Sequence, residues 1–379
     1  MGHEVKRETV DGISYFSDVE GPYSLNDNAL EVANLLIRPR GKPLGHKFFD
    51  QLSAYDDYLV DIEKKPNYNS GCTLGLLLPF LKAFGATNKL LEDISLKNAT
   101  LIPGTKDTLQ YLQGKINCCL ISTSYEQHIR AFCKVTGFPF ENTVCTKLDI
   151  DNEIYELNST ESEWLKKRAE EIISLPKIVL PSKVKSRNEL AEDTFSSIER
   201  LDQIFWDEME NEYSKVFELL KSVNTIGGPK KERAILERTS DVSSVIYTGD
   251  SITDREALRR VRKEDGLAVS INGDIYAVNE AEIGCMIKNT IVTAVIVDVF
   301  YNTSKEGVFD LVHNWNITGL KKAKEKLLVN PKLVDDLIDL YPKKLPEVVI
   351  LTDENREKFA ANSSNFGKDL RKLKVHGNE

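Results

Sequence analysis

Four short apolar runs, each leading into small or polar residues, constrain the fold of this chain more than any other feature. They occupy residues 13–16, 116–121, 245–248 and 267–271. Runs of this length without polar alternation are typical of strands buried on both faces of a parallel sheet. Stretches with helical spacing of apolar residues follow several of them, for example after Ser124 and after Thr253. The sequence therefore predicts an α/β fold with a parallel sheet.

The intervals between the runs predict how the chain is organised. Residues 23–98 and 151–225 are too long to be loops in a compact domain. Their helical spacing predicts a helical cap at 23–98 and a second, mostly helical insertion at 151–225. The α/β core then comprises residues 1–22, 99–150 and 226–290. Residues 291–379 form a C-terminal extension, which we expect to be largely helical and to fray in its lysine-rich tail.

Composition excludes several classes of function. The formal net charge of −9 lacks the basic footprint of a nucleic-acid-binding protein. The 6 cysteines show neither a CxxC pair nor zinc-binding spacing, so we expect reduced thiols and no disulfide framework. The polar N-terminus has no signal-peptide core, and the apolar stretch at 291–301 is shorter than the roughly 20 residues that span a bilayer. We therefore expect a cytoplasmic protein without membrane insertion.

Polar side chains gather where the predicted strands end and where helices begin. In open α/β sheets, ligands bind beyond the carboxyl ends of the strands. The side chains at these positions are therefore the candidate site. In chain order they are Asp18, Glu20, Ser122, Thr123, Lys230, Lys231, Asp250 and Asp254.

These residue types suit phosphoryl transfer. A carboxylate such as Asp18 can attack phosphorus and form an aspartyl phosphate. A second acid two residues later, Glu20, can protonate the leaving oxygen and then activate water. Hydroxyl and ammonium groups can hold phosphoryl oxygens, and clustered carboxylates can bind Mg²⁺, which favours oxygen ligands. Each motif taken alone could instead be an ordinary turn, a helix cap or a solvated helix start. Only their joint occurrence in this order favours a catalytic site.

The same residues lie in four motifs that resemble, in order, those of the haloacid dehalogenase superfamily. Residues 16–22 resemble its strand-end DxD motif, and residues 120–122 resemble its second motif. Residues 227–231 open a helix like that of the third motif, and residues 249–254 carry the GDxxxD pattern of the fourth. The resemblance implies a Rossmann-like core with a parallel sheet, helical cap insertions and phosphatase activity.

For the metal and the chemistry, the resemblance implies the following roles. Asp18 would be the nucleophile and a metal ligand. Glu20 would act as acid and base and offer its backbone carbonyl to the metal. Asp250 would complete the protein's share of the Mg²⁺ site, with Asp254 at its shell or just outside it.

For the phosphoryl group, the resemblance implies a second set of residues. Ser122, with Thr123 beside it, would bind the phosphoryl oxygens. Lys231 would pair with Asp18 and the phosphate, because it fits the family's helix start better than Lys230 does. Lys230 stays an alternative at this point.

Two departures from the family pattern bear on activity. Glu20 replaces the usual aspartate, as in enolase-phosphatase relatives, and its longer side chain changes the reach of the acid. Pro22 replaces the usual threonine or valine and stiffens the turn. Residues 18–22, 73–74 with 78–88, and 121–125 further resemble an archaeal branch often labelled subunit R of energy-converting hydrogenase A. That label implies gene association, and no cysteine set here could hold an iron–sulfur or nickel centre.

The leading hypothesis is a Mg²⁺-dependent phosphatase that acts on a small phosphorylated metabolite. An alternative is a catalytically weak accessory or binding subunit associated with an energy-converting hydrogenase. A third is a phosphotransferase or phosphomutase. The residues leave open whether the protein forms a homo-oligomer. The sequence of the cap does not indicate which substrate is bound.

Overall fold

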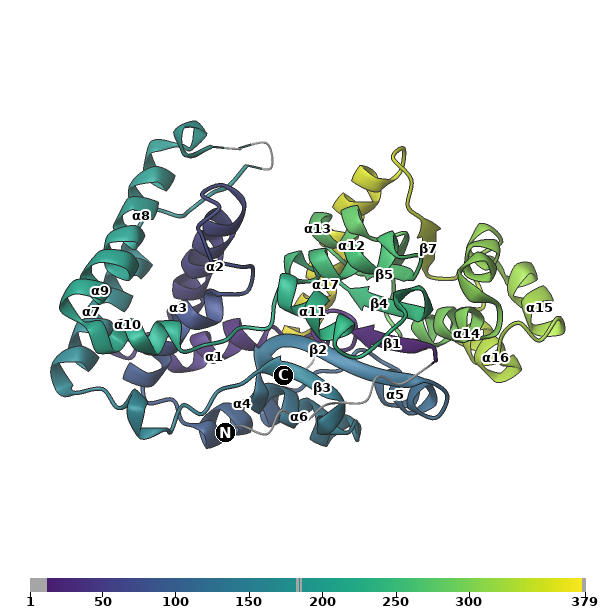
Figure 1. The fold of residues 1–379 in the computed structure, drawn as a ribbon, viewed down its shortest axis with the longest axis horizontal. Helices are drawn as coiled ribbons and strands as arrows, with labels where there is room; N and C mark the ends of the chain where they lie inside the picture. Colours follow the sequence, from purple (N-terminus) through teal and green to yellow (C-terminus); the bar gives the residue numbers. More distant parts are fainter. Residues whose placement is uncertain (1–11, 182–183, 185, 377–379) are drawn as a thin grey trace.

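The centre of the computed structural model is a mixed sheet. The structure describes residues 12–181, 184 and 186–376, so the polar N-terminus at 1–11 lies outside the described residues. Within these residues, a 7-stranded sheet has the order β3-β2-β1-β4-β5-β6-β7 (Figure 1). All neighbouring strands are parallel except β6 and β7, which pair antiparallel. The strands are β1 (Ser14–Ser17), β2 (Asn117–Tyr125), β3 (Thr143–Thr146), β4 (Val245–Gly249), β5 (Leu267–Ile271), β6 (Ile283–Met286) and β7 (Glu347–Ile350). The predicted α/β fold with a parallel sheet is confirmed.

Apolar side chains cover both faces of this sheet. Alternate residues of a strand point to opposite faces, so Tyr15 and Ile246 enter one apolar cluster while Phe16 and Tyr247 enter another. The first cluster is completed by helices α5 (Thr105–Gln113), α6 (Glu126–Thr136), α14 (Ile291–His313), α15 (Ile317–Glu325) and α16 (Pro331–Leu340). The second is completed by α11 (Pro229–Leu236), α12 (Arg255–Lys263), α13 (Ile275–Glu280) and α17 (Arg356–His376). Burial on both faces explains why the strands read as continuous apolar runs.

A separate helical lobe lies beside the carboxyl edge of the sheet (Figure 1). We define it as α1 (Asn28–Leu36), α2 (Gly45–Asp61), α3 (Thr73–Ala83), α7 (Ser159–Ser174), α8 (Glu192–Gln203), α9 (Met209–Glu212) and α10 (Ser214–Lys221). Helix α4 (Asn88–Asn98) contacts both this lobe and α6. One apolar cluster contains residues of both long intervals of the chain, such as Phe48, Phe80 and Phe205. The two intervals therefore share a single core.

The last ninety or so residues, expected to be an extension outside the core, contribute a strand to the sheet and helices that pack against it. Strand β7 adds an antiparallel edge to β6, and helix α17 packs against α13 and β6. The lysine-rich tail, expected to fray, is helical as far as His376. Phe359, Ala360 and Leu370 are buried on its inner side, and this burial holds the helix in place.

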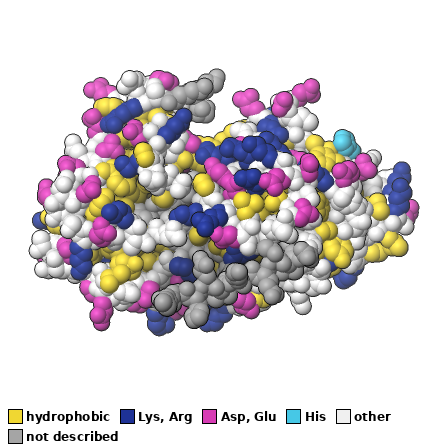
Figure 2. Space-filling view, in the orientation of Figure 1, with side chains coloured by type: hydrophobic (Ala, Val, Ile, Leu, Met, Phe, Trp, Pro, Cys, Tyr) yellow, Lys and Arg dark blue, Asp and Glu magenta, His cyan; other side chains and the backbone are white. Residues whose placement is uncertain are grey.

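The described part of the chain contains no membrane-spanning helix, and its surface carries charges of both signs (Figure 2). No helix among those residues is both long and apolar enough to cross a bilayer. Figure 2 shows Lys and Arg side chains interspersed with Asp and Glu side chains over the face that it displays.

Candidate active site

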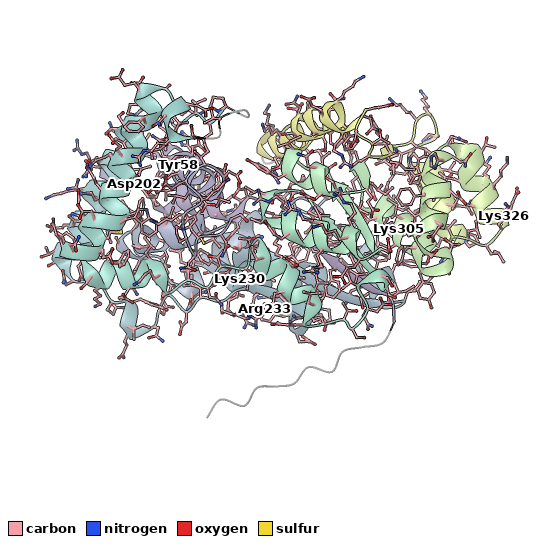
Figure 3. The ribbon with its side chains drawn as sticks, turned by 45° about the horizontal axis from the view of Figure 1, so that its top comes forward. Tyr58, Asp202, Lys230, Arg233, Lys305 and Lys326 are labelled. Carbon is pink, nitrogen blue, oxygen red and sulfur yellow. The ribbon has the colours of Figure 1, made fainter. Side chains whose placement is uncertain are left out.

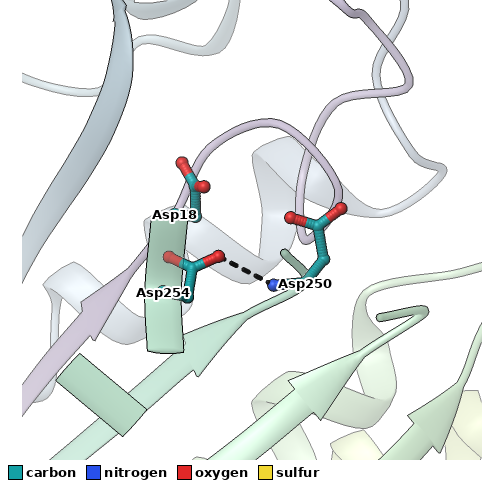
Figure 4. Close-up of side chains that lie close together, drawn as sticks. All are labelled: Asp18, Asp250 and Asp254. Carbon is teal, nitrogen blue, oxygen red and sulfur yellow. Dashed lines mark hydrogen bonds between the residues drawn. The ribbon is translucent and has the colours of Figure 1, made fainter. Parts of the chain in front are cut away.

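Three aspartates meet at the carboxyl edge of the sheet. Asp18 follows β1, and Asp250 follows β4, which pairs directly with β1. Asp254 ends the short 3₁₀ turn Ile252–Asp254 that precedes α12. One carboxylate oxygen of each residue lies within 4.8 Å of those of the other two, and all three side chains are buried (Figure 4). The adjacency of the two strands thus brings together residues more than 230 positions apart.

The turn after β1 wraps closely over Asp250. Gly21 has a φ of 96°, in the left-handed region that favours glycine. A Cβ atom at this position would lie 2.2 Å from the Asp250 carboxylate. Glycine is therefore required here, because any side chain would displace the carboxylate from the cluster.

Lys231 bridges two of the aspartates. Its Nζ donates to Asp18 Oδ2 at 2.6 Å and to Asp254 Oδ1 at 2.7 Å, and the side chain is fully buried. Burial alone would lower the pKa of this lysine, but the charges of Asp18 and Asp254 raise it above its usual value. Lys230 instead lies at the junction of the helical lobe and the core (Figure 3), where its Nζ donates to Asn224 Oδ1. Of the two candidate lysines, the site contains Lys231.

The oxygens of Asp254 are occupied by protein donors. Oδ1 accepts from Lys231 and, at 2.6 Å, from the hydroxyl of Tyr247. Oδ2 accepts from the backbone N–H groups of Asp250, at 3.0 Å, and Ser251, at 3.1 Å (Figure 4). Asp254 therefore fixes the lysine and the loop after β4, and Asp18 and Asp250 are left as the carboxylates most open to a ligand.

Burial destabilises the ionised forms of Asp18 and Asp250, and a nearby positive charge would stabilise them. Burial raises the pKa of Asp18 to about 6, although Lys231 acts to lower it. Burial likewise raises the pKa of Asp250 well above its usual value, although Arg371 acts to lower it. A cation between these carboxylates would offset the cost of burying them. A donor set made only of carboxylate oxygens suits a hard divalent cation. The residues present therefore fit a metal ion.

Glu20 lies beside the aspartate cluster and lines the same cavity, and both of its carboxyl oxygens accept hydrogen bonds from other residues. Its Oε1 accepts from the backbone N–H of Asn28 at 2.8 Å, and its Oε2 accepts from the Ser124 hydroxyl at 2.9 Å. His128 Nε2 lies 3.3 Å from Oε1. Burial, with the charge of Asp27, raises the pKa of Glu20 to about 8. The elevated pKa favours the protonated form of this side chain, which is the form that a general acid needs.

The hydroxyl residues occupy the end of β2. Ser122 is buried, and its Oγ accepts from the backbone N–H of Ser124 at 3.2 Å. The Oγ1 atom of Thr123 is buried with no hydrogen-bond partner among the described residues. Both hydroxyls can donate to a ligand in the cavity that they line.

A cavity of about 340 Å³ opens above the cluster. Its floor is the carboxyl edge of the sheet, including Asp18 and Asp250, and one wall is formed by the helical lobe, including Asp57 of α2. This volume suits a small-molecule ligand. A further wall comes from α17, which supplies Ser364, Gly367, Lys368 and Arg371.

Several residues of this site were not predicted from the sequence. Asp274 lines the cavity and caps α13 by accepting from Tyr276 N at 2.8 Å; its place just after the apolar run 267–271 was a usable signal. Asp57 and Arg371 carried no such signal. Asp57 lies on α2 in the helical lobe, and Arg371 reaches Asp250 from 121 residues farther along the chain.

No family model matches this chain, and no curated protein matches it. Among solved structures, the gene product AF1437 from Archaeoglobus fulgidus is similar, with a TM-score of 0.73 and 24% sequence identity. The alignment covers 95% of this chain and 97% of that chain. At this level of identity the likeness concerns the fold alone. The chain is thus an α/β protein with a buried aspartate triad that could hold a metal ion.

Proposed function

We propose that this chain is a phosphohydrolase of the haloacid dehalogenase type, which hydrolyses a phosphate monoester of a small metabolite and depends on Mg²⁺. The observation that carries the proposal is the convergence of Asp18, Asp250 and Asp254 around the buried amine of Lys231. The order of these residues along the chain matches the motif order of that superfamily. The adjoining cavity, with hydroxyls at one edge, supports a small phosphorylated ligand.

Asp18 and Asp250 would hold the metal ion, with Asp254 behind them as the acceptor that positions Lys231. When bound there, Mg²⁺ would supply the charge that offsets repulsion between Asp18 and an anionic phosphate ester. Asp18 attacks phosphorus and forms an aspartyl phosphate as the alcohol leaves. Ser122, Thr123 and Lys231 bind the phosphoryl oxygens through their hydroxyl and ammonium groups. Glu20 donates its proton to the leaving oxygen and then takes a proton from the water that cleaves the aspartyl phosphate.

Release of phosphate from a broad panel of monoesters, including p-nitrophenyl phosphate, tests this proposal. We expect hydrolysis with Mg²⁺, a loss of at least about 100-fold when the metal is chelated, and recovery when Mg²⁺ is restored. Ca²⁺ serves as a matched control, because it takes more ligands at longer distances than Mg²⁺ does and is expected not to support hydrolysis. Hydrolysis that continues unchanged in the chelator, or a panel with no substrate at all, contradicts the proposal.

The acid role of Glu20 makes a prediction that depends on the leaving group. Glu20→Gln is expected to lower kcat for an alkyl phosphate by about 100-fold or more, because the alkoxide needs a proton as it departs. The first step with p-nitrophenyl phosphate, whose leaving group is stable without a proton, is expected to be nearly unchanged. A burst of p-nitrophenol followed by slow turnover is the measurable signature. Equal losses in the first step with both substrates would exclude the role.

A further inference from the structure

Helix α17 presents one face to the proposed active site. Ser364, Gly367, Lys368 and Arg371 line the cavity, and their spacing of three and four residues places them on the same side of the helix. A Cβ atom at Gly367 would lie 2.8 Å from the carbonyl oxygen of Asn272, in the loop after β5. The glycine thus allows the helix to lie directly against the carboxyl edge of the sheet.

Arg371 reaches the metal-binding residues from this helix. Its Nη2 donates to Asp250 Oδ2 at 3.0 Å. Burial would lower the pKa of Arg371, but the charges of Asp250, Asp27 and Glu20 raise it. The guanidinium therefore bonds the Asp250 carboxylate directly, with Asp27 and Glu20 as further acidic neighbours.

The charges around the cavity make this contact unusual. Among the described residues that line it, the acidic side chains are Asp18, Glu20, Asp27, Asp56, Asp57, Asp250 and Asp274. The basic ones are Lys368 and Arg371, and only Arg371 is bonded to a residue of the aspartate cluster. A phosphate ester that enters the cavity would therefore meet mostly negative charge, and Lys368 and Arg371 of α17 are the basic side chains among the described residues that line it.

We infer that Arg371 neutralises Asp250 before the cation binds and turns toward the phosphoryl group when the cation takes that carboxylate. The inference rests on the proposed function. A guanidinium and a divalent cation repel each other and compete for the same carboxylate, so Arg371 weakens metal binding on its own. Once released, the same guanidinium strengthens binding of an anion, for which Arg is suited by its planar array of donors.

The two opposite effects can be measured by calorimetry, first with Mg²⁺ alone and then with inorganic phosphate at saturating Mg²⁺. For Arg371→Ala we expect Mg²⁺ to bind at least about fivefold more tightly and phosphate at least about fivefold more weakly. Lys372→Ala is the matched control, because it removes the same charge one residue along α17, where Lys372 pairs with Asp369 on the surface. It is expected to change either dissociation constant by less than about twofold.

The outcomes separate this inference from the proposal beneath it. Wild-type protein that fails to bind Mg²⁺ removes the proposed function. Wild-type binding with both affinities unchanged in Arg371→Ala, or with both weakened together, overturns the role of Arg371 alone, since a purely structural contact would act in one direction. If the alanine variant does not fold, Arg371→Lys keeps the charge but not the planar fork. It is then expected to bind phosphate more weakly with little change for Mg²⁺, and equal affinities for phosphate would overturn the inference.

Discussion

Asp18→Asn will lower phosphate-ester hydrolysis by at least about 1,000-fold, because the amide cannot attack phosphorus. Asparagine has nearly the same shape and can still accept the 2.6 Å hydrogen bond that the Val19 N–H donates to Asp18 Oδ1. Lys231 loses one charged partner in this variant but keeps Asp254, so we expect the protein to stay folded. Steady-state kinetics, with circular dichroism to check the fold, measures both parts of the prediction.

A covalent intermediate provides the sharper test of Asp18. Rapid acid quench of the wild type during turnover is expected to leave phosphate on the peptide that contains Asp18, and mass spectrometry can locate it. The Asp18→Asn protein should show none. Asp339→Asn, which alters an exposed carboxylate on α16, is the matched control and is expected to behave as wild type. Phosphate attached to a different residue would show that Asp18 is not the nucleophile.

Lys231→Met is expected to cost both activity and stability. Methionine fills similar space without charge, so Asp18 and Asp254 would remain buried beside each other with their shared counter-charge removed. Removing one partner from a buried ion pair destabilises a protein by about 3–5 kcal/mol. We also expect kcat to fall by at least about 100-fold, because under the proposed function the lysine would hold both the nucleophile and the phosphoryl group.

The neighbouring lysine offers a control for this variant in the same helix turn. Lys230→Met removes the same charge from a side chain that bonds only to Asn224 among the described residues. Urea unfolding and the hydrolysis assay are both expected to return values close to wild type. Similar losses for the two variants would mean that the position of Lys231 between the aspartates has no special importance.

The central strands could be predicted because their physical signal is local. Burial on both faces makes β1, β4 and β5 continuous apolar runs, and the chain order of the polar residues that follow them is visible without coordinates. The motif resemblance also favoured Lys231 over Lys230, and in the structure Lys231 shares a buried face of α11 with Ala234 and Ile235. The parts of the site that depend only on residues close together in the chain could therefore be predicted from the sequence.

The remaining parts depend on contacts between distant segments. Strands β3, β6 and β7 have only 4 residues each, and unlike β1, which is equally short, they are not followed by a motif that marks where the strand ends. Arg371 lies in a stretch of mixed polar residues, and only the packing of α17 against β6 and α13 brings it to Asp250. The direction of the Glu20 side chain was equally hidden, because its partners at Asn28 and Ser124 come from two other elements.

The shared core of the helical lobe restricts how the protein can open. The chain leaves the sheet for the lobe after β1 and again after β3, and it returns each time. A lobe connected by one pair of linkers can swivel freely about them, whereas two pairs at separate places block rotation about either alone. Movement of the lobe is therefore limited to a slight, concerted flexing of all the connections. Under the proposed function, such a movement would admit a compact substrate and keep bulk solvent out during hydrolysis.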